Sequence, residues 1–407
     1  MILFVVVLLY HLLSSALAAK SPRKSADKYV ENTYFVTFHD DLEPFGGPQV
    51  YNQHLSWIRE QQEVQDICEF KVFPCYSAKI PPELKEKIKK RPEVMWVEQV
   101  SEIYGSALLS NSTPEQTQNI IVSDIVYQSD SPWVLARISN RGRFTPQDSF
   151  RYPAKAGEGV DIYMLDTGIF IQHQQFGGRA SFGVSFVEGE AESDAAGHGT
   201  FCSGLAAGST YGVAKRASLI SVKVLNSQSL GSGKGIAQGI DWVIAKAAQT
   251  GRPSVINLSL EAPRSDTLNR FVDKALEAGI HVVVASGNNS VSACSRSPAS
   301  SNGITVSASD SFDFFSPFSN DGECVDIFAP GTAVPSCYIG SEIAIAADSG
   351  TSQAAAIVSG TIAMYLSEKS FTPSEMKSFL IQTSAKDVLN AVPAGTPNRL
   401  LDTSRVF

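Results

Sequence analysis

Five short apolar runs rich in β-branched residues lie between residues 160 and 308, and they constrain the fold more than any other feature. They are Val160–Leu165, Leu219–Leu225, Ser254–Ser259, His281–Ala285 and Ile304–Ala308. A strand that is covered on both faces is apolar throughout, whereas a half-exposed strand alternates. Helical stretches at 235–248 and 266–278 lie between these runs. This alternation predicts an α/β fold with a doubly wound parallel sheet.

A small α+β domain is predicted ahead of this sheet, over residues 34–103. Its expected elements are strands at Tyr34–Phe38, Phe70–Phe73 and Val94–Glu98, with helices near 49–63 and 82–90. Residues 104–130 are rich in Ser, Asn, Thr, Pro and Gln without a clear period, so we predict a linker there. Within it, Asn111-Ser112-Thr113 is a glycosylation sequon at Asn111.

The first 18 residues are mostly apolar and end in Ala16-Leu17-Ala18. This pattern is typical of a cleaved secretory signal peptide, although the usual basic start is missing. The alternative is a membrane anchor, but the run is shorter than the roughly 20 residues that span a bilayer. We therefore expect a secreted protein with no membrane association, in which disulfides are permitted.

Charge and cysteine content argue against three classes of protein. Lys and Arg number 33 against 41 Asp and Glu, a net charge of −8. This balance argues against a nucleic-acid partner, because binding the phosphate backbone requires a basic surface. Six cysteines in 407 residues, with no CxxC pair, indicate neither a disulfide scaffold nor a cysteine zinc site.

A doubly wound sheet places its chemistry beyond the carboxyl ends of its strands, and four polar residues of this chain are candidates for that chemistry. Asp166 ends the first run, and Asn288 follows the fourth. His198 is flanked by glycines, which let a substrate approach an imidazole closely. Ser352 opens an apolar helix whose N-terminus stabilises negative charge. Each residue alone has an ordinary alternative, such as a turn aspartate or an N-cap serine.

The motifs Asp166-Thr167-Gly168, Gly197-His198-Gly199-Thr200 and Gly350-Thr351-Ser352 occur in the order known from subtilisin. Together they strongly resemble the subtilisin-like serine proteases (peptidase S8), in particular the proteinase K branch. The resemblance runs from about residue 131 to 401 and implies a subtilisin-type catalytic domain over that range. It also implies that 34–103 is an inhibitory propeptide of the I9 type and that 104–130 contains the maturation site.

The resemblance assigns roles to these residues. It implies that Ser352 is the nucleophile, His198 the general base, Asp166 the residue that orients it, and Asn288 an oxyanion donor. Two backbone segments are implied to bind extended peptide substrates: Gly231-Ser232-Gly233 and Ser259-Leu260-Glu261. No cofactor is implied for catalysis. The implied partners are protein or peptide substrates and the chain's own propeptide, and we expect a monomer.

The chain departs from the family pattern at Phe201, Gln353 and the segment Glu261-Ala262-Pro263. Gln353 followed by three alanines resembles the ninth vertebrate proprotein convertase, which cleaves itself and then acts as a binding protein. An otherwise inactive, self-cleaving binding protein is therefore the alternative function. We expect Glu261 to point to solvent, because acidic residues are rarely buried unpaired. The alternative is that it faces inward and pairs with a substrate Lys or Arg.

The resemblance also bears on cysteines and metal. It implies a disulfide between Cys294 and Cys324, and a buried free thiol at Cys202. Cys68 and Cys75 are a candidate second pair, which spacing alone does not settle. Asp326 aligns with a calcium ligand of proteinase K, with carbonyls near Asn302 and Ile304 alongside. An ordinary aspartate at a strand end is the alternative, because no acidic cluster supplies the oxygens that calcium prefers.

Overall fold

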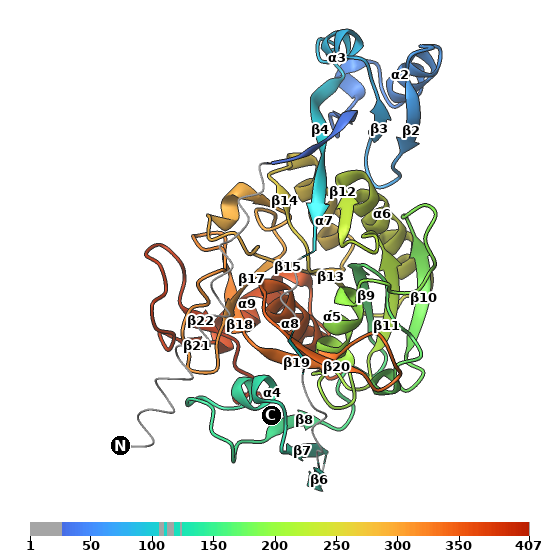
Figure 1. Ribbon diagram of the computed structural model, residues 1–407. Helices are drawn as coiled ribbons and strands as arrows, with labels where there is room; N and C mark the ends of the chain where they lie inside the picture. The colour runs from blue at the N-terminus through green and yellow to red at the C-terminus, as the bar shows by residue number, and fades with distance from the viewer. Residues whose placement is uncertain (1–26, 106–109, 112–117, 123, 407) are drawn as a thin grey trace.

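The computed structural model describes residues 27–105, 110–111, 118–122 and 124–406. The expected signal peptide, residues 1–18, lies outside the described residues. Figure 1 shows a small N-terminal domain seated on a larger domain built around a central sheet.

The central sheet has nine strands in the order β10-β11-β9-β13-β15-β17-β18-β22-β21. Their bounds are β9 Asp161–Asp166, β10 Ala180–Ser185, β11 Ser218–Lys223, β13 Ser254–Leu258, β15 His281–Ala285, β17 Ile304–Ser309, β18 Ile327–Pro330, β21 Ala385–Lys386 and β22 Arg399–Leu400. All neighbours run parallel except β21 and β22. The predicted doubly wound α/β sheet is confirmed, and all five apolar runs are strands of it.

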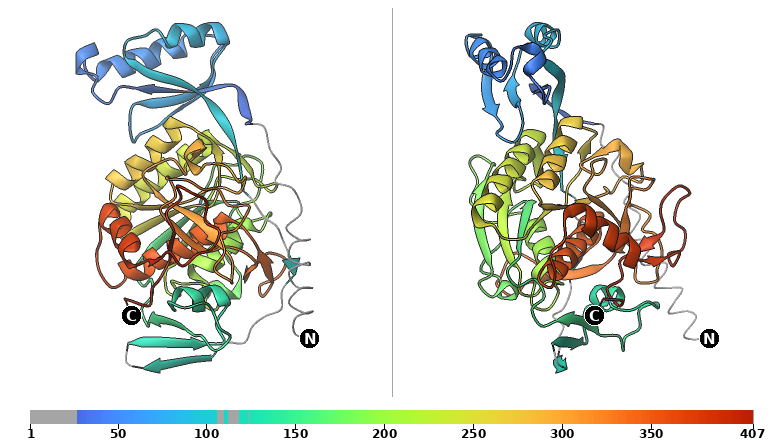
Figure 2. Two further views of the ribbon diagram at one scale, coloured as in Figure 1. Left: turned by 90° about the vertical axis from the view of Figure 1, so that its left-hand side faces the viewer. Right: turned by 180° about the vertical axis from the view of Figure 1, so that it is seen from behind.

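Both faces of this sheet are covered by helices, which explains why its strands do not alternate. In β9, Ile162 and Met164 pack into the core that contains α5 (His198–Ala207) and α8 (Thr351–Leu366). Tyr163 and Leu165 pack into the opposite core, with α6 (Gly233–Thr250) and α7 (Asp266–Glu277). Figure 2 shows these helix pairs on opposite sides of the sheet.

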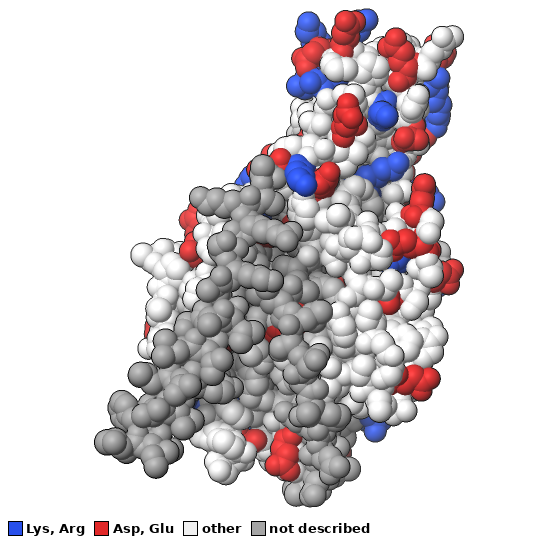
Figure 3. Space-filling model, in the orientation of Figure 1, with Lys and Arg blue, Asp and Glu red and all other residues white. Residues whose placement is uncertain are grey.

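The N-terminal domain has its own antiparallel sheet and its own core. Its elements are β1 Tyr29–Phe38, α2 Gln49–Arg59, β2 Gln65–Glu69, β3 Cys75–Lys79, α3 Pro82–Ile88 and β4 Val94–Tyr104. The sheet order is β4-β1-β3-β2, with Val36, Leu55 and Tyr76 in the core. Figure 3 shows acidic and basic side chains interspersed over the visible face of this domain.

The strand expected at Phe70–Phe73 is wrong, because this segment is the turn between β2 and β3. Phe70 and Phe73 are instead buried against Phe271 of α7, with ring centroids 4.9 and 4.7 Å apart respectively. These residues are apolar because they dock the N-terminal domain on the larger one.

The expected linker contains strands where it is described. β6 (Gln118–Val122) and β7 (Ile125–Ser129) form a hairpin, and β7 pairs with β8 (Phe150–Pro153). β5 (Ser110–Asn111) pairs with β20 (Ile345–Asp348), and the backbone of Asn111 lies opposite Ala346. Glycosylation of Asn111 remains a prediction.

The remaining elements are short and lie around the central sheet, except for the turn Glu43–Phe45, which lies in the N-terminal domain between β1 and α2. They are α4 Trp133–Ile138, α9 Pro373–Thr383, β12 Leu230–Ser232, β14 Ala262–Pro263, β16 Arg296–Ser297, β19 Val334–Cys337 and the 3₁₀ turns Glu43–Phe45, Gln174–Phe176 and Ala293–Ser295. In the described part of the chain, no helix combines the length and apolar character needed to cross a bilayer.

Candidate active site

Asp166 and His198 are brought together by the parallel sheet and the helix that packs on it. Asp166 is the last residue of β9 and His198 the first of α5. His198 Nδ1 lies 2.7 Å from Asp166 Oδ1, and both side chains are buried. Because Nδ1 faces the carboxylate, it carries the proton, which leaves Nε2 free to accept one. This is the arrangement that a general base requires.

The surroundings of His198 favour its protonated form. Burial by itself lowers the pKa of an imidazole, but the adjacent Asp166 carboxylate raises the pKa of His198 well above its ordinary value. An imidazolium that formed here during a reaction would therefore be stabilised.

Two glycines let His198 take its place at the start of α5. Gly197 has φ +92°, a backbone conformation that favours glycine, and a Cβ there would collide with the ring of Tyr338. A Cβ on Gly199 would collide with the carbonyl oxygen of Gly168. The helix thus approaches the Asp166 loop closely because both positions lack side chains.

Ser352 is the second residue of α8 and is buried, like every other residue of that helix. Its hydroxyl donates to the carbonyl oxygen of Ser259 at 3.1 Å. Ser259 Oγ in turn donates to the Ser352 carbonyl at 2.9 Å, which ties the helix start to the end of β13. Cys202 Sγ, one turn into α5, lies 3.9 Å from His198 Nε2. In this structure the serine hydroxyl is therefore directed at Ser259, so attack on a substrate requires it to rotate.

Asn288 lies next to the start of α8. Its Oδ1 accepts hydrogen bonds from the backbone N–H of Thr351 at 2.8 Å and from the Thr351 hydroxyl at 3.0 Å. These bonds fix the orientation of the amide, so its Nδ2 is held on the side of Gly350. A side-chain N–H and the N-terminus of a helix together form a site that suits an oxyanion.

The end of the N-terminal domain lies in the cleft beside these residues. Strand β4 pairs antiparallel with β12, with Ile103 opposite Gly231 and Glu102 opposite Ser232. A Cβ on Gly231 would lie only 2.5 Å from the Val224 carbonyl, so this strand position requires glycine. Gly233 starts helix α6 directly after it.

The end of β4 also pairs with the segment at Glu261, on the edge opposite β12. There, Tyr104 and Glu261 exchange two backbone hydrogen bonds of 3.2 Å. On the β12 side, the Gly105 N–H donates to Ser229 O at 2.9 Å. A Cβ built on Gly105 would lie 3.7 Å from His198 Nδ1. The tail of the N-terminal domain is thus held as an extended strand that leads to the candidate catalytic residues.

The expectation that Glu261 points to solvent is wrong. Its carboxylate accepts a hydrogen bond from Asn289 Nδ2, and a Cβ on Gly287 would collide with its Oε2. That second oxygen is buried and has no hydrogen-bond partner among the described residues. Burial raises the pKa of Glu261, and the positive charge of Arg296 opposes this. The side chain faces inward because the segment around Gly287 leaves space for it.

Sequence reasoning missed Asp194, which organises the loop before His198. Its buried carboxylate accepts hydrogen bonds from the N–H groups of Ala196, Gly197 and Thr200 and from the hydroxyls of Thr167 and Thr200, at 2.7–3.0 Å. The one signal in the sequence was an aspartate three residues before a helix N-cap, where an acid satisfies free N–H groups.

A buried lysine supports the Asp166 loop from behind and was also missed. Lys223 ends β11 in register with Asp166, and its Nζ donates to the Thr167 carbonyl at 2.6 Å. Glu190 Oε2 lies 3.2 Å from the same ammonium and balances its charge. A lysine within an apolar strand was the available signal, since lysine is almost never fully buried without a partner.

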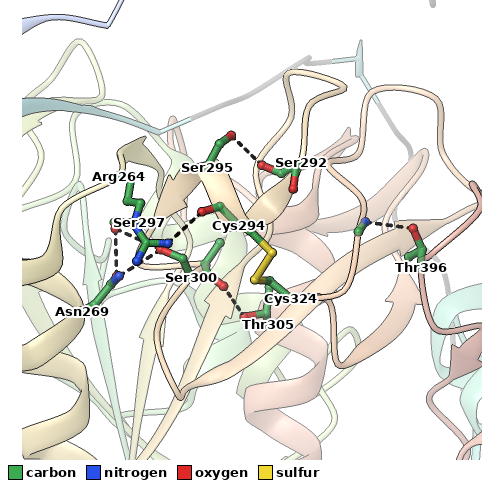
Figure 4. Close-up of a disulfide and its surroundings, with 12 residues drawn as sticks. Arg264, Asn269, Ser292, Cys294, Ser295, Ser297, Ser300, Thr305, Cys324 and Thr396 are labelled. Carbon is green, nitrogen blue, oxygen red and sulfur yellow. Dashed lines mark hydrogen bonds between the residues drawn. A yellow bond between two sulfur atoms is a disulfide. The ribbon is translucent and has the colours of Figure 1, made fainter.

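Cys294 and Cys324 form a disulfide, which Figure 4 shows with its surroundings. The chain's other four cysteines, Cys68, Cys75, Cys202 and Cys337, are free. The candidate pairing of Cys68 with Cys75 is therefore not formed, and Cys75 Sγ lies 3.6 Å from Thr37 Oγ1 instead.

The surroundings of Asp326 do not fit a calcium ion. Its Oδ2 accepts a hydrogen bond from Thr305 N at 2.9 Å and lies 2.8 Å from Lys377 Nζ. A hard divalent cation requires six to eight oxygens, and here a cationic side chain already uses the carboxylate.

Comparison with known proteins gives one consistent match. A family model described as the Subtilase family (peptidase S8) matches residues 157–400. Among similar proteins, Subtilisin-like protease 8 of Trichophyton verrucosum is 39% identical over 352 residues, which cover 81% of this chain and 68% of the relative. Alkaline protease 2 of Aspergillus fumigatus is 37% identical over 349 residues, covering 80% and 67%.

A solved structure matches as well. A cold adapted subtilisin-like serine proteinase superposes with a TM-score of 0.64 at 37% sequence identity. The match covers 68% of this chain and 99% of that one.

Proposed function

Because this chain belongs to the subtilase family of serine endopeptidases, we propose that it hydrolyses peptide bonds with Ser352, His198 and Asp166. The observation that carries the proposal is the 2.7 Å contact between His198 Nδ1 and Asp166 Oδ1, with Cys202 Sγ 3.9 Å from both His198 Nε2 and the Ser352 carbonyl oxygen. It leaves the other imidazole nitrogen free to accept the proton of the Ser352 hydroxyl.

The reaction proceeds through an acyl-enzyme. Ser352 Oγ forms a bond to the peptide carbonyl carbon while its proton moves to His198 Nε2. The negative oxygen of the tetrahedral intermediate is stabilised by Asn288 Nδ2 and the Ser352 N–H. His198 then gives its proton to the leaving amine, and water repeats the sequence on the ester. Asp166 stays ionised and holds the imidazole. No cofactor takes part in these steps.

We also propose that residues 34–103 are an inhibitory propeptide and that the chain matures by its own cleavage. The pairing of β4 with β12, and of Tyr104 with Glu261, supports this, because substrates add a strand to such edges. Because Tyr104 and Gly105 lead this tail toward His198, we place the cut within residues 104–130. Gly231, Ser232, Gly233, Ser259, Leu260 and Glu261 then bind the residues before the cut.

The apolar segment over residues 1–18 supports secretion, and the disulfide between Cys294 and Cys324 is compatible with an oxidising compartment. We propose an extracellular monomeric enzyme whose substrates are proteins or peptides. The alternative is a self-cleaving binding protein in which the propeptide stays in the cleft.

Expression of Ser352→Ala beside the parent tests autoprocessing. The parent is expected to yield two fragments cut within residues 104–130, and Ser352→Ala a single uncut chain, both measured by intact mass. Ser349→Ala is the matched control, because Ser349 lies in the same loop and bonds only the Ala333 N–H through its hydroxyl. Normal cutting of Ser352→Ala would show that another protease is responsible.

Hydrolysis in trans separates the enzyme from the binding protein. The mature domain, freed of its N-terminal fragment, is expected to cleave casein. A fully processed sample that cleaves only itself would instead favour the binding protein.

A further inference from the structure

Lys377, in helix α9, extends its side chain to the edge of the central sheet. Its Nζ lies 2.8 Å from Asp326 Oδ2 and donates to the carbonyl oxygens of Gly303 at 3.0 Å and Asn302 at 3.4 Å. The lysine is 51 positions away from the aspartate in the sequence, so this cluster is a product of the fold.

Three oxygens converge here because two neighbouring parallel strands begin at the same level. Asn302 and Gly303 precede β17, and Asp326 precedes β18. The strand starts are joined by two further hydrogen bonds, from Thr305 N to Asp326 Oδ2 and from Asp326 N to Thr305 O, both 2.9 Å. The carboxylate and the two carbonyls thus form a rigid acceptor set.

An ammonium satisfies this set without any additional ligand. It has three N–H donors: the two carbonyl oxygens accept hydrogen bonds, and Asp326 Oδ2 forms an ion pair with it. Its single positive charge balances the single carboxylate. Calcium at the same place would find at most four protein oxygens, two carbonyls and both carboxylate oxygens, of the six to eight it prefers. It would also lie beside the ammonium, where like charges repel.

We propose that Lys377 acts as a built-in cation at this site, in place of a structural metal. The lysine joins α9 to the starts of β17 and β18, which a metal ion bound only to those strands would not do. The stability contributed by this site is therefore independent of calcium. This proposal does not depend on the catalytic proposal above.

Melting temperatures measured with EDTA and with millimolar CaCl₂ test the proposal. All variants carry Ser352→Ala, which prevents autolysis. The calcium effect, defined as the difference between the two melting temperatures, is expected to be the same in the parent and in Asp326→Asn. Any calcium site elsewhere contributes equally to both proteins and cancels.

Lys377→Ala and Lys377→Met remove the ammonium, and Met keeps most of the apolar stem. Both are expected to melt about 3 °C or more below the parent in EDTA. Lys274→Ala is the matched control, because Lys274 pairs with Glu277 on the exposed side of α7, and it should melt like the parent. If either Lys377 variant regains stability with calcium, this result supports the proposal, because the three oxygens then bind a metal only after the ammonium has been removed.

Two results would overturn the proposal. One is a calcium effect in the parent that exceeds that of Asp326→Asn, because a metal would then be bound at Asp326. The other is Lys377→Met and Lys377→Ala both melting like the parent in EDTA, since the ammonium would then contribute nothing.

Discussion

The Asp194 carboxylate accepts a hydrogen bond from the Thr167 hydroxyl at 2.8 Å, and Thr167 Oγ1 itself accepts one from the Gly199 N–H at 2.9 Å. Thr167 follows Asp166 in the chain, and Gly199 follows His198. This chain of bonds therefore joins the loop of the acid to the helix of the base. We expect the 2.7 Å contact between Asp166 and His198 to depend on that connection.

Asp194→Asn is expected to lower kcat by roughly 10- to 100-fold with little change in KM, because an amide cannot accept from all five donors. The folded state is expected to lose about 2 kcal/mol or more. Active-site titration and thermal melting measure the two effects separately. Asp266→Asn, at an exposed helix start, is the control and should change neither. An Asp194→Asn enzyme with unchanged kcat per active site would contradict the positioning role.

Asn288→Ala is expected to lower kcat by about 10²- to 10³-fold, because one donor to the oxyanion is lost. KM should change little, since this bond is stronger in the transition state than with bound substrate. The measurement is steady-state kinetics on a chromogenic peptide. A loss confined to KM would place Asn288 in ordinary substrate binding instead.

Glu261 is expected to control the side chain accepted before the scissile bond. Its inward-facing carboxylate, whose Oε2 has no hydrogen-bond partner in the described part of the chain, favours a Lys or Arg side chain, and Glu261→Gln should lower kcat/KM for such peptides about 10-fold or more. Glu261→Gly should instead admit large apolar side chains. The measurement is the cleavage preference of the mature parent, Glu261→Gln and Glu261→Gly enzymes on a peptide library. Glu158→Gln is the control, because Glu158 is exposed. Identical preferences in all four enzymes would exclude this role.

His281 is expected to make the folded state sensitive to acid. Burial lowers the pKa of His281 from the ordinary 6.5 to about 4, and its Nδ1 has no hydrogen-bond partner among the described residues. The unfolded chain therefore binds this proton more readily than the folded one. The neutral form of His281 therefore contributes about 3 kcal/mol to the free energy of unfolding. This contribution is complete above pH 6.5 and is lost as the pH falls toward 4.

Thermal melting between pH 7 and pH 4 checks this in a Ser352→Ala background. His281→Gln should lose less stability over that interval than its parent, whereas His39→Gln should follow the parent. Equal losses in His281→Gln and the parent would show that His281 does not titrate in this range.

Local sequence patterns were sufficient for the central sheet and for the candidate triad. The runs that include Val160–Leu165 and His281–Ala285 predicted buried parallel strands, because burial on both faces removes alternation. Asp166, His198 and Ser352 were found because small residues around them leave a short, recognisable pattern. The roles of these residues, and of the substrate-binding segments, remain proposals.

Contacts between distant segments were decided only by the tertiary structure. The apolar run Phe70–Phe73 was predicted as a strand, yet it is a turn whose rings pack on Phe271. The sequence shows that these residues are apolar, but it does not show which surface they cover. Glu261 turns inward because Gly287, 26 positions later, leaves room for it. Lys377 meets Asp326 only because α9 packs beside the starts of β17 and β18. Hydrophobic periodicity records burial along one segment, whereas the partner of a buried charge depends on which segments the whole chain brings together.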